Sequence, residues 1–225
     1  MFSVIFEVRP RTEQWDSYLG IATMLRPELE KVDGFADNIR YRSLTRKGWI
    51  LSLSGWRDEK SVVRWRTHAR HHSAQERGRT EIFLDYHLRV GQVTKDTNIP
   101  RGFELHEQRL DETEAGESTT VIFINGNFDS EQLKTTNAED VAKHLGLRSR
   151  AEGLLSWDVF DAVLTPGDVI LLLSWRTRLE AEIFENSISP RTGTRLRRVR
   201  IVRDYGMYDR REAPQYYADV SRNAG

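Results

Sequence analysis

Three of the six histidines of this chain fall within five residues, at His68, His71 and His72. His68 and His72 are four residues apart, so a helix would place both imidazoles on one face. Such a pair can bind a metal, hold a haem iron or transfer protons near neutral pH. The segment lacks the His-Glu-x-x-His pattern and no dense carboxylate group adjoins it, so we predict no metal site here. We predict instead that His71 or His72 is a catalytic base.

A second group of residues could bind and activate a flat aromatic compound. A deprotonated, electron-rich substrate can pass an electron to oxygen, so the protein must bind it, remove a proton and exclude water. Glu7 is a third candidate catalytic residue, because it occupies the expected inward position of the first strand. The predicted substrate-binding residues are aromatic walls, arginine partners for a phenolate and one further histidine: Phe6, Arg40, Trp56, Arg57, Trp65, His68, Phe83 and Tyr86.

The chain repeats itself, and the repeat indicates which elements must position these residues. Residues 50–57 read almost the same as residues 170–176, and in both copies a glycine precedes the tryptophan of this segment by 22 residues. The triplet Val4-Ile5-Phe6 likewise reappears as Val121-Ile122-Phe123. A period of about 110 residues is too long for a solenoid and indicates two copies of one small domain.

Each copy is predicted to follow the order βαββαβ, the split arrangement of the ferredoxin-like fold. Apolar residues at spacings of three and four predict a helix over 13–32, bent at Pro27. A second segment over 58–75 is predicted to be helical with breaks at its histidines. Strands are expected at 2–8, 35–44, 49–56, 82–93, 120–127, 154–164, 169–175 and 195–202, and helices of the second copy at 138–149 and 178–186.

These elements divide the chain into an N-terminal domain at 1–96, a linker at 97–118, a degenerate C-terminal domain at 119–208 and a tail at 209–225. The linker is polar and long enough to cross the protein surface. The end of the chain is too aromatic to be solvated, so we expect five side chains to dock: Tyr205, Met207, Tyr208, Tyr216 and Tyr217.

Composition argues against several function classes. The 225 residues carry 34 basic and 34 acidic side chains, so the zero net charge gives no global reason to bind nucleic acid or an anionic membrane. Because no cysteine is present, the chain has no disulfide, thiolate metal site or cysteine nucleophile. No apolar stretch approaches about 18 residues and no basic leader precedes the first strand, so we expect a soluble, cytoplasmic protein.

Four segments of the first copy carry a family resemblance: 4–8, 25–35, 51–59 and 65–75. Together they are similar to the antibiotic biosynthesis monooxygenase domain family, and the similarity is weaker over 119–208. The resemblance implies a dimeric α+β barrel, in which two ferredoxin-like units join their sheets. With both units in one chain, we predict two ferredoxin-like βαββαβ domains fused into an intrachain dimeric α+β barrel, either a monomeric pseudo-dimer or a homodimer.

The family resemblance also implies two kinds of chemistry, because the family includes cofactor-free and haem-degrading oxygenases. Haem-degrading relatives combine an Asn on the first strand with a Trp and a His on the second helical segment. Trp65 resembles that Trp, and His71 or His72 resembles that His. The first strand carries Glu7 and no Asn, whereas Asn125 lies on the corresponding strand of the other copy. The Asn, Trp and His of haem-degrading relatives are therefore split between the two copies, which argues against haem degradation.

The copies differ in the segment that carries the histidines. An interval of 37 residues separates Trp56 from Val93, whereas 27 residues separate Trp175 from Val202. Either the fused pair kept one active pocket in the first copy, or the histidines are exposed polar residues and the deletion is drift. Trp56 has two possible roles as well. Because Trp175 repeats it in the other copy, Trp56 is either a substrate-binding residue or a core anchor that both copies need.

We predict a monooxygenase-like protein that oxidises a small aromatic or polyketide-like substrate without a metal, flavin or other cofactor. One alternative is a haem-binding or haem-degrading monooxygenase, and another is a non-catalytic scaffold for assembly or for binding a small hydrophobic ligand. An enzyme predicts an enclosed cavity with a histidine, whereas a scaffold predicts a filled barrel centre and solvated histidines. The expected partner is a small aromatic or hydrophobic ligand, with no nucleic acid and no membrane.

Overall fold

The order of elements repeats along the chain. The computed structural model describes residues 1–189 and 192–221. The first half contains β1 (Phe2–Pro10), α1 (Trp15–Leu29), β2 (Phe35–Ser43), β3 (Ile50–Trp56), α2 (Glu59–Arg66), α3 (Ala69–Arg77) and β4 (Phe83–Asp96). The second half contains β5 (Thr120–Asn127), α4 (Ser130–Thr135), α5 (Ala138–His144), β6 (Leu154–Ala162), β7 (Asp168–Trp175), α6 (Arg178–Ser187) and β8 (Arg195–Gly206). Both halves follow βαββαβ, which confirms the predicted ferredoxin-like fold.

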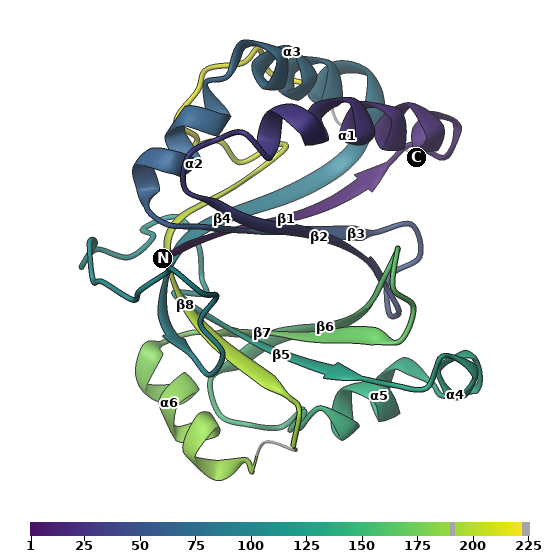
Figure 1. Cartoon of the computed structure of the whole chain (residues 1–225), viewed down its shortest axis with the longest axis vertical. Coiled ribbons are helices and arrows are strands. Elements are labelled where there is room, and N and C mark those ends of the chain that lie inside the picture. The colour runs from purple at the N-terminus through teal and green to yellow at the C-terminus, as the bar shows by residue number, and fades with distance from the viewer. Residues whose placement is uncertain (190–191, 222–225) are drawn as a thin grey trace.

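The strands of both halves form one closed barrel in the order β1-β3-β2-β6-β7-β5-β8-β4. The halves join where β2 pairs with β6 and where β4 pairs with β8, in both cases antiparallel. Helices α1 to α3 cover the barrel on one side and α4 to α6 cover it on the other (Figure 1). The predicted fused α+β barrel is therefore confirmed. None of the described helices is long and apolar enough to cross a membrane.

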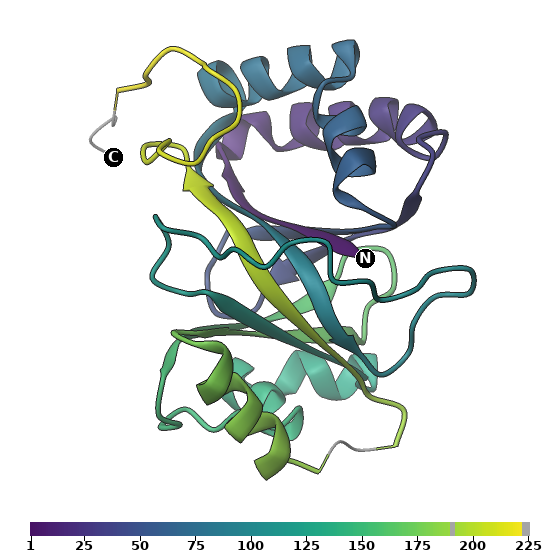
Figure 2. The same cartoon turned by 90° about the vertical axis from the view of Figure 1, so that its left-hand side faces the viewer.

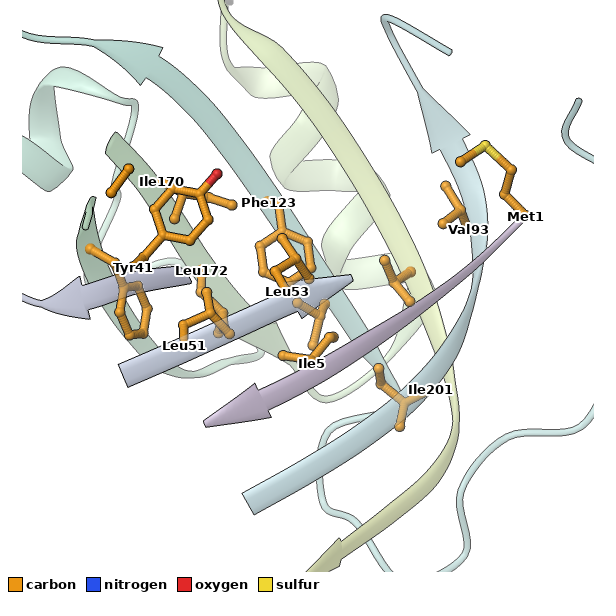
Figure 3. Close-up of a cluster of buried hydrophobic side chains, with 14 residues drawn as sticks. Met1, Ile5, Tyr41, Leu51, Leu53, Val93, Phe123, Ile170, Leu172 and Ile201 are labelled. Atoms are coloured by element: carbon orange, nitrogen blue, oxygen red, sulfur yellow. The ribbon is translucent and has the colours of Figure 1, made fainter. Parts of the chain in front are cut away.

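The centre of the barrel is a packed apolar core. Every strand contributes side chains to it, including Ile5, Leu51, Phe123 and Phe160, which are completely buried (Figure 3). Interiors packed in this way leave few voids larger than a water molecule. From the segment between the halves, Phe103 packs against the same cluster. A filled centre is what the scaffold hypothesis predicted. A ligand site must therefore lie on an outer face of the sheet, under the helices.

A buried charged cluster ties the two halves together. Glu7 of β1 accepts a hydrogen bond from Arg89 of β4 at 2.6 Å and another from Arg46, which follows β2. Arg46 also donates to Asp158 of β6 at 2.7 Å, so it bridges the halves. Burial alone would raise the pKa of Glu7, but the charges of Arg89 and Arg46 hold that pKa below its usual value.

Strand register corrects one predicted equivalence between the copies. Trp56 pairs with Phe2 and Trp175 pairs with Thr120, so counting from the tryptophans makes Ile122 the counterpart of Val4. The predicted match of Val4 with Val121 is wrong by one residue. Because successive side chains of a strand point to opposite faces, this slip exchanges the barrel face for the helix face.

The structure also corrects several element boundaries. The helical segment predicted over 58–75, with breaks at its histidines, has one break, where the extended backbone of His68 separates α2 from α3. Helix α5 ends at His144 and not at 149, because Gly146 adopts a φ of 105° and the Leu147 amide bonds back to the Ala142 carbonyl. The short helix α4 was not predicted, and β8 continues past Val202 to Gly206.

The chain after β8 docks only in part. Tyr205 and Met207 are buried, as predicted, and Tyr217 contacts α3. Tyr216 is 91% exposed, so the prediction that it docks is wrong. Neighbouring residues of an extended segment face opposite ways, so docking Tyr217 turns Tyr216 outward. Figure 2 shows this tail, in yellow, running from the end of β8 along the first half.

Candidate functional site

The first half encloses a cavity between its helices and the outer face of its strands. The cavity measures about 770 Å³, which is large enough for a small organic ligand. Its walls include Leu25 of α1, Trp65 of α2, His71 of α3 and Phe6 of β1. Segments far apart in the sequence thus meet around one mainly apolar space that contains a histidine, as the enzyme hypothesis predicted.

The cavity has a floor of small and polar side chains. Ser52 and Ser54 of β3 line it, together with Asn38 and Arg40 of β2. The Ser52 hydroxyl accepts a hydrogen bond from the Asn38 amide at 3.0 Å, and the Ser54 hydroxyl accepts one from the Trp56 indole at 2.9 Å. The serines satisfy these donors and occupy little volume, so they leave space above the sheet.

The equivalent floor of the second half is apolar and large. In the registers that pair each half's strands, Leu171 and Leu173 take the places of Ser52 and Ser54. Trp157 and Val159 likewise replace Asn38 and Arg40. Leu171, Leu173 and Val159 belong to the packed core under α5 and α6. A separate pocket of about 260 Å³ lies beside the end of α5, and none of these four floor residues lines it.

One further detail supports this equivalence. The buried Trp175 indole nitrogen has no hydrogen-bond partner among the described residues, whereas its counterpart Trp56 donates to Ser54. Leu173, in the place of Ser54, has no hydroxyl to accept the bond. Both tryptophans are buried, at 1% and 0% exposure, so Trp56 is a core anchor that also lines the cavity.

Trp65 stacks with two histidine rings. Its ring stacks on the His71 imidazole at 4.3 Å between centroids and 15° between planes, and on the His68 imidazole at 5.6 Å and 28°. The break between α2 and α3 makes this possible, because it lets α3 start in a new direction three residues after Trp65. His71 and Trp65 line the cavity, and His68 packs behind Trp65, 3.9 Å from Glu28.

The hydrogen bonds of His71 define its neutral tautomer. Nδ1 lies 2.9 Å from the Trp65 carbonyl oxygen, and because a carbonyl can only accept, Nδ1 carries the proton. Nε2 is then the unprotonated nitrogen, and no group of the described residues is bonded to it. Burial lowers the pKa of His71 to about 4, although the bond to Trp65 opposes this shift. His71 is therefore a neutral imidazole at pH 7 with a free basic nitrogen.

His72 has a different environment from His71. Its ring stacks on Tyr217 at 5.5 Å, and its Nδ1 lies 3.2 Å from the Tyr217 hydroxyl and 3.2 Å from the Gln215 amide nitrogen. His72 is exposed and is not among the cavity-lining residues. The two adjacent histidines are therefore separated, with His71 on the cavity and His72 on the tail.

The structure divides the remaining predicted residues. Those that line the cavity are Phe6, Arg40, Trp56, Trp65, Phe83 and Tyr86. Arg57 lies elsewhere, on the surface, where it forms a two-pronged ion pair with Asp33. Glu7 points to the barrel side of β1, where two arginines hold it and His87 Nδ1 lies 3.8 Å away, so it does not line the cavity with His71. No group of three or more histidine, aspartate or glutamate side chains suited to a metal ion occurs among the described residues.

Sequence reasoning missed the polar residues that complete the wall. Gln75 lies one helical turn after His71 and 3.1 Å from its Nδ1, and Tyr217 donates to Gln75 at 2.9 Å. Arg79 and Arg210 both donate to the Tyr86 hydroxyl at 2.7 Å. The aromatic tail was a signal that this segment docks, but nothing in the sequence indicates that it docks beside Tyr86.

Comparison with known proteins shows which family this chain is similar to. Residues 1–77 match the family model described as antibiotic biosynthesis monooxygenase. The chain is 49% identical over 226 residues to a protein of Pyricularia oryzae named jasmonate monooxygenase ABM, covering 98% of this chain and 100% of that protein.

Solved structures also resemble the whole chain, although their sequences differ widely. An anthrone oxidase-like protein is 10% identical, with a TM-score of 0.37 and coverage of 95% of this chain and 96% of that one. A monooxygenase-like protein from Listeria innocua is 12% identical, with a TM-score of 0.25 and coverage of 89% and 94%.

Proposed function

Because this chain belongs to the antibiotic biosynthesis monooxygenase family, we propose that it inserts one oxygen atom of O₂ into a small, largely apolar compound held in the cavity of its first half. The observation that carries the proposal is the neutral His71, stacked on Trp65, at the wall of that cavity. Jasmonate, named for the Pyricularia oryzae relative, is the first substrate to test. Small aromatic and polyketide-like compounds form the second group.

His71 is the proposed general base. Its free Nε2 can take a proton from a phenol or from a carbon next to a carbonyl group, and general bases contribute about 10²- to 10⁴-fold to rates. The imidazolium formed is stabilised by the Trp65 carbonyl at Nδ1 and by the Trp65 ring stacked on it. The pKa of about 4 describes the site without a ligand, and an anion bound nearby would raise it.

The proposed reaction requires no metal, flavin or other cofactor. The deprotonated substrate gives an electron to O₂, the two radicals combine, and the resulting hydroperoxide loses water to leave a carbonyl group. The net change is CH₂ + O₂ → C=O + H₂O, in which the substrate supplies every electron. A simple hydroxylation would instead take two electrons from an external reductant.

The aromatic walls would protect the reactive intermediate. Phe6 packs edge-on against Phe83 at 5.8 Å, and Tyr86 lies 5.7 Å from Phe6. With Trp56 and Trp65 these rings form apolar surfaces on several sides of the cavity. Excluding water prevents early protonation of the substrate anion and strengthens its electrostatic contacts.

One observation favours a second candidate, a haem-binding monooxygenase. A histidine that donates Nδ1–H to a carbonyl and leaves Nε2 free is arranged like a metal-ligating histidine, so His71 could hold haem iron. Bound haem would supply oxygen activation. Arg40 and Arg66 at the same cavity could then pair with carboxylate groups of the porphyrin.

Oxygen uptake and product mass test the proposal directly. Purified protein is incubated with jasmonate under ¹⁸O₂, without added reductant or haem, alongside His71→Ala and the exposed-histidine control His106→Ala. The proposal predicts products carrying one ¹⁸O atom in the wild type and in His106→Ala but not in His71→Ala. Turnover only after haem addition, with a Soret band lost in His71→Ala, would favour the second candidate. No turnover of jasmonate or of phenolic substrates in either condition would reject both.

A further inference from the structure

The cavity of the first half has an excess of positive charge. Of the acidic residues that line it, Glu30 pairs with Arg26 and Glu59 pairs with Arg109. Five arginines line it without an ion pair among the described residues: Arg40, Arg66, Arg79, Arg203 and Arg210. Among the described residues that line the cavity, Asp37 is the one remaining acid that could balance these five arginines. Arg79 is buried and the other four arginines are partly buried. Since charges withdrawn from water are normally paired, this imbalance points to an anionic ligand.

Tyr86 provides a specific donor for that anion. Its oxygen accepts hydrogen bonds from Arg79 and Arg210, each at 2.7 Å. A phenol oxygen has two lone pairs and one hydrogen, and a guanidinium can only donate, so both lone pairs are occupied. The hydroxyl hydrogen is left as the group that Tyr86 offers, and no acceptor for it occurs among the described residues. Tyr86 is 6% exposed and lines the cavity, so the acceptor must come from a bound molecule.

We propose that Tyr86, Arg79 and Arg210 form an anion subsite that binds the carboxylate of an acidic substrate. The Tyr86 hydroxyl donates to one carboxylate oxygen, and the two guanidinium groups behind it strengthen that donor and balance the negative charge. This inference rests on the proposed function, because it defines the substrate class of the same cavity as apolar carboxylic acids. Arg79 is 4% exposed and also donates to the Met207 carbonyl at 3.0 Å, so its charge is held at the site before any ligand binds.

The C-terminal tail completes this subsite. Arg210 lies four residues after β8, and its guanidinium also donates to the Gln215 carbonyl at 2.7 Å. Arg79 donates to the Ala218 carbonyl at 3.3 Å, which holds the tail against the first half. Tyr217 then connects the tail to Gln75 at 2.9 Å, and Gln75 lies 3.1 Å from His71. One continuous set of contacts therefore joins the proposed anion subsite to the proposed base.

A pair of probes that differ only in charge tests the subsite. Fluorescence titration at pH 7 compares 1-naphthaleneacetate with its uncharged methyl ester, so that binding is measured independently of turnover. Wild type is compared with Tyr86→Phe and with Tyr216→Phe, the matched change at a tyrosine that is 91% exposed. Since a hydrogen bond to a charged group contributes about 1.5–3 kcal/mol, Tyr86→Phe should bind the acid about 10- to 100-fold more weakly. Binding of the ester, and all binding by Tyr216→Phe, should be unchanged.

A second pair of variants keeps the test decisive if Tyr86→Phe misfolds. Arg210→Gln should weaken binding of the acid by about tenfold or more, whereas Arg211→Gln, at an exposed arginine of the same tail, should not. Equal binding of acid and ester by wild type, or no binding of the acid, would overturn the subsite. So would unchanged acid binding in both Tyr86→Phe and Arg210→Gln. Selective binding of the acid without jasmonate turnover would support the anion subsite and reject the proposed reaction. Jasmonate turnover without selective binding of the acid would support the reaction and reject the subsite.

Discussion

The first half of the barrel holds a cavity of about 770 Å³ under its helices, while the matching floor of the second half is filled by the packed core under α5 and α6. The sheets beneath them have the same order and the same antiparallel registers. What differs is the side chains at four equivalent floor positions and the helices above them, since α4 and α5 stand where the first half has α1. Ser52 and Ser54 leave room where Leu171 and Leu173 fill it, and α3 has no counterpart after β7 among the described residues. The floor side chains together with the covering helices therefore separate a ligand site from a packed core.

The features that both halves keep belong to the barrel itself. Arg89 pairs with Ile5 across the strands as Arg197 pairs with Phe123, and both arginines are buried. Arg89 donates to the carboxylate of Glu7, and Arg197 donates to the amide oxygen of Asn125 at 2.8 Å. The barrel side of the sheet thus preserves the repeat while the helix side diverges. This division indicates that Glu7 and Asn125 are structural residues.

The largest effect is expected from removing the base that the second half lacks. We predict that His71→Ala lowers kcat by about 10²- to 10⁴-fold, because the substrate loses its proton acceptor. His72→Ala, which changes a tail contact, should affect kcat far less. Steady-state oxygen uptake by the two variants checks this. A larger loss in His72→Ala than in His71→Ala would reverse the roles assigned to the adjacent histidines.

A large effect on stability is expected at Glu7. Glu7→Ala leaves the buried Arg89 without its carboxylate, and breaking a buried pair costs about 3–5 kcal/mol of unfolding free energy. Asn125→Ala removes a neutral partner from Arg197 and should cost less, about 1–3 kcal/mol. Urea denaturation measures both. If Glu7 is structural, kcat per folded molecule is unchanged, whereas a catalytic Glu7 would lower kcat at full stability.

Filling the cavity with a side chain of the second half should abolish binding. Ser52→Leu introduces the residue that Leu171 provides in the equivalent place, and Asn38 keeps a second acceptor in the Leu53 carbonyl. We predict at least tenfold weaker ligand binding with a midpoint of urea denaturation equal to or above that of wild type. Ser156→Leu, at an exposed serine of β6, is the matched control. Undiminished binding by a folded Ser52→Leu protein would place the ligand elsewhere.

The smallest predicted effect is a pH dependence of stability. The folded protein lowers the pKa of His71 from 6.5 to about 4, so between these values the unfolded chain binds a proton that the folded chain does not. This contribution to stability is complete above pH 6.5 and is lost as the pH falls toward about 4. Thermal denaturation from pH 7 to 4.5 should therefore show a shallower decline in His71→Gln than in wild type. Parallel declines would contradict the depressed pKa.

Much of the fold was predictable because the internal repeat gives the same order of elements in both halves. The apolar run of residues 121–124, which repeats that of the first strand, gives β5 as observed, and the tryptophans mark equivalent strand ends. The histidines indicated breaks in the helical segment 58–75, but the exact place of the break between α2 and α3 was not predictable, because tertiary packing decides the backbone of Thr67 and His68. The repeat alignment failed at Val4 because one-residue slips in an apolar strand preserve its composition.

Sequence alone predicted those site residues whose type suits them to a ligand cavity, namely aromatic residues and histidine. Trp65, His71, Phe6 and Tyr86 were predicted and do meet at one cavity. Arg57 and Glu7 were chosen by sequence position, and the structure shows them bound in ion pairs away from it. The contribution of Arg210 could not be predicted, because it depends on where a tail without periodic structure docks.

The most direct test of the comparison is the stoichiometry of jasmonate binding by isothermal titration calorimetry, with wild type and Ser52→Leu. The account predicts one equivalent bound per chain of wild type, in the cavity lined by Trp65 and His71, and none bound by Ser52→Leu. Two equivalents per chain, or unchanged binding in the variant, would contradict the conclusion that the first half holds the ligand and the second half is its packed counterpart.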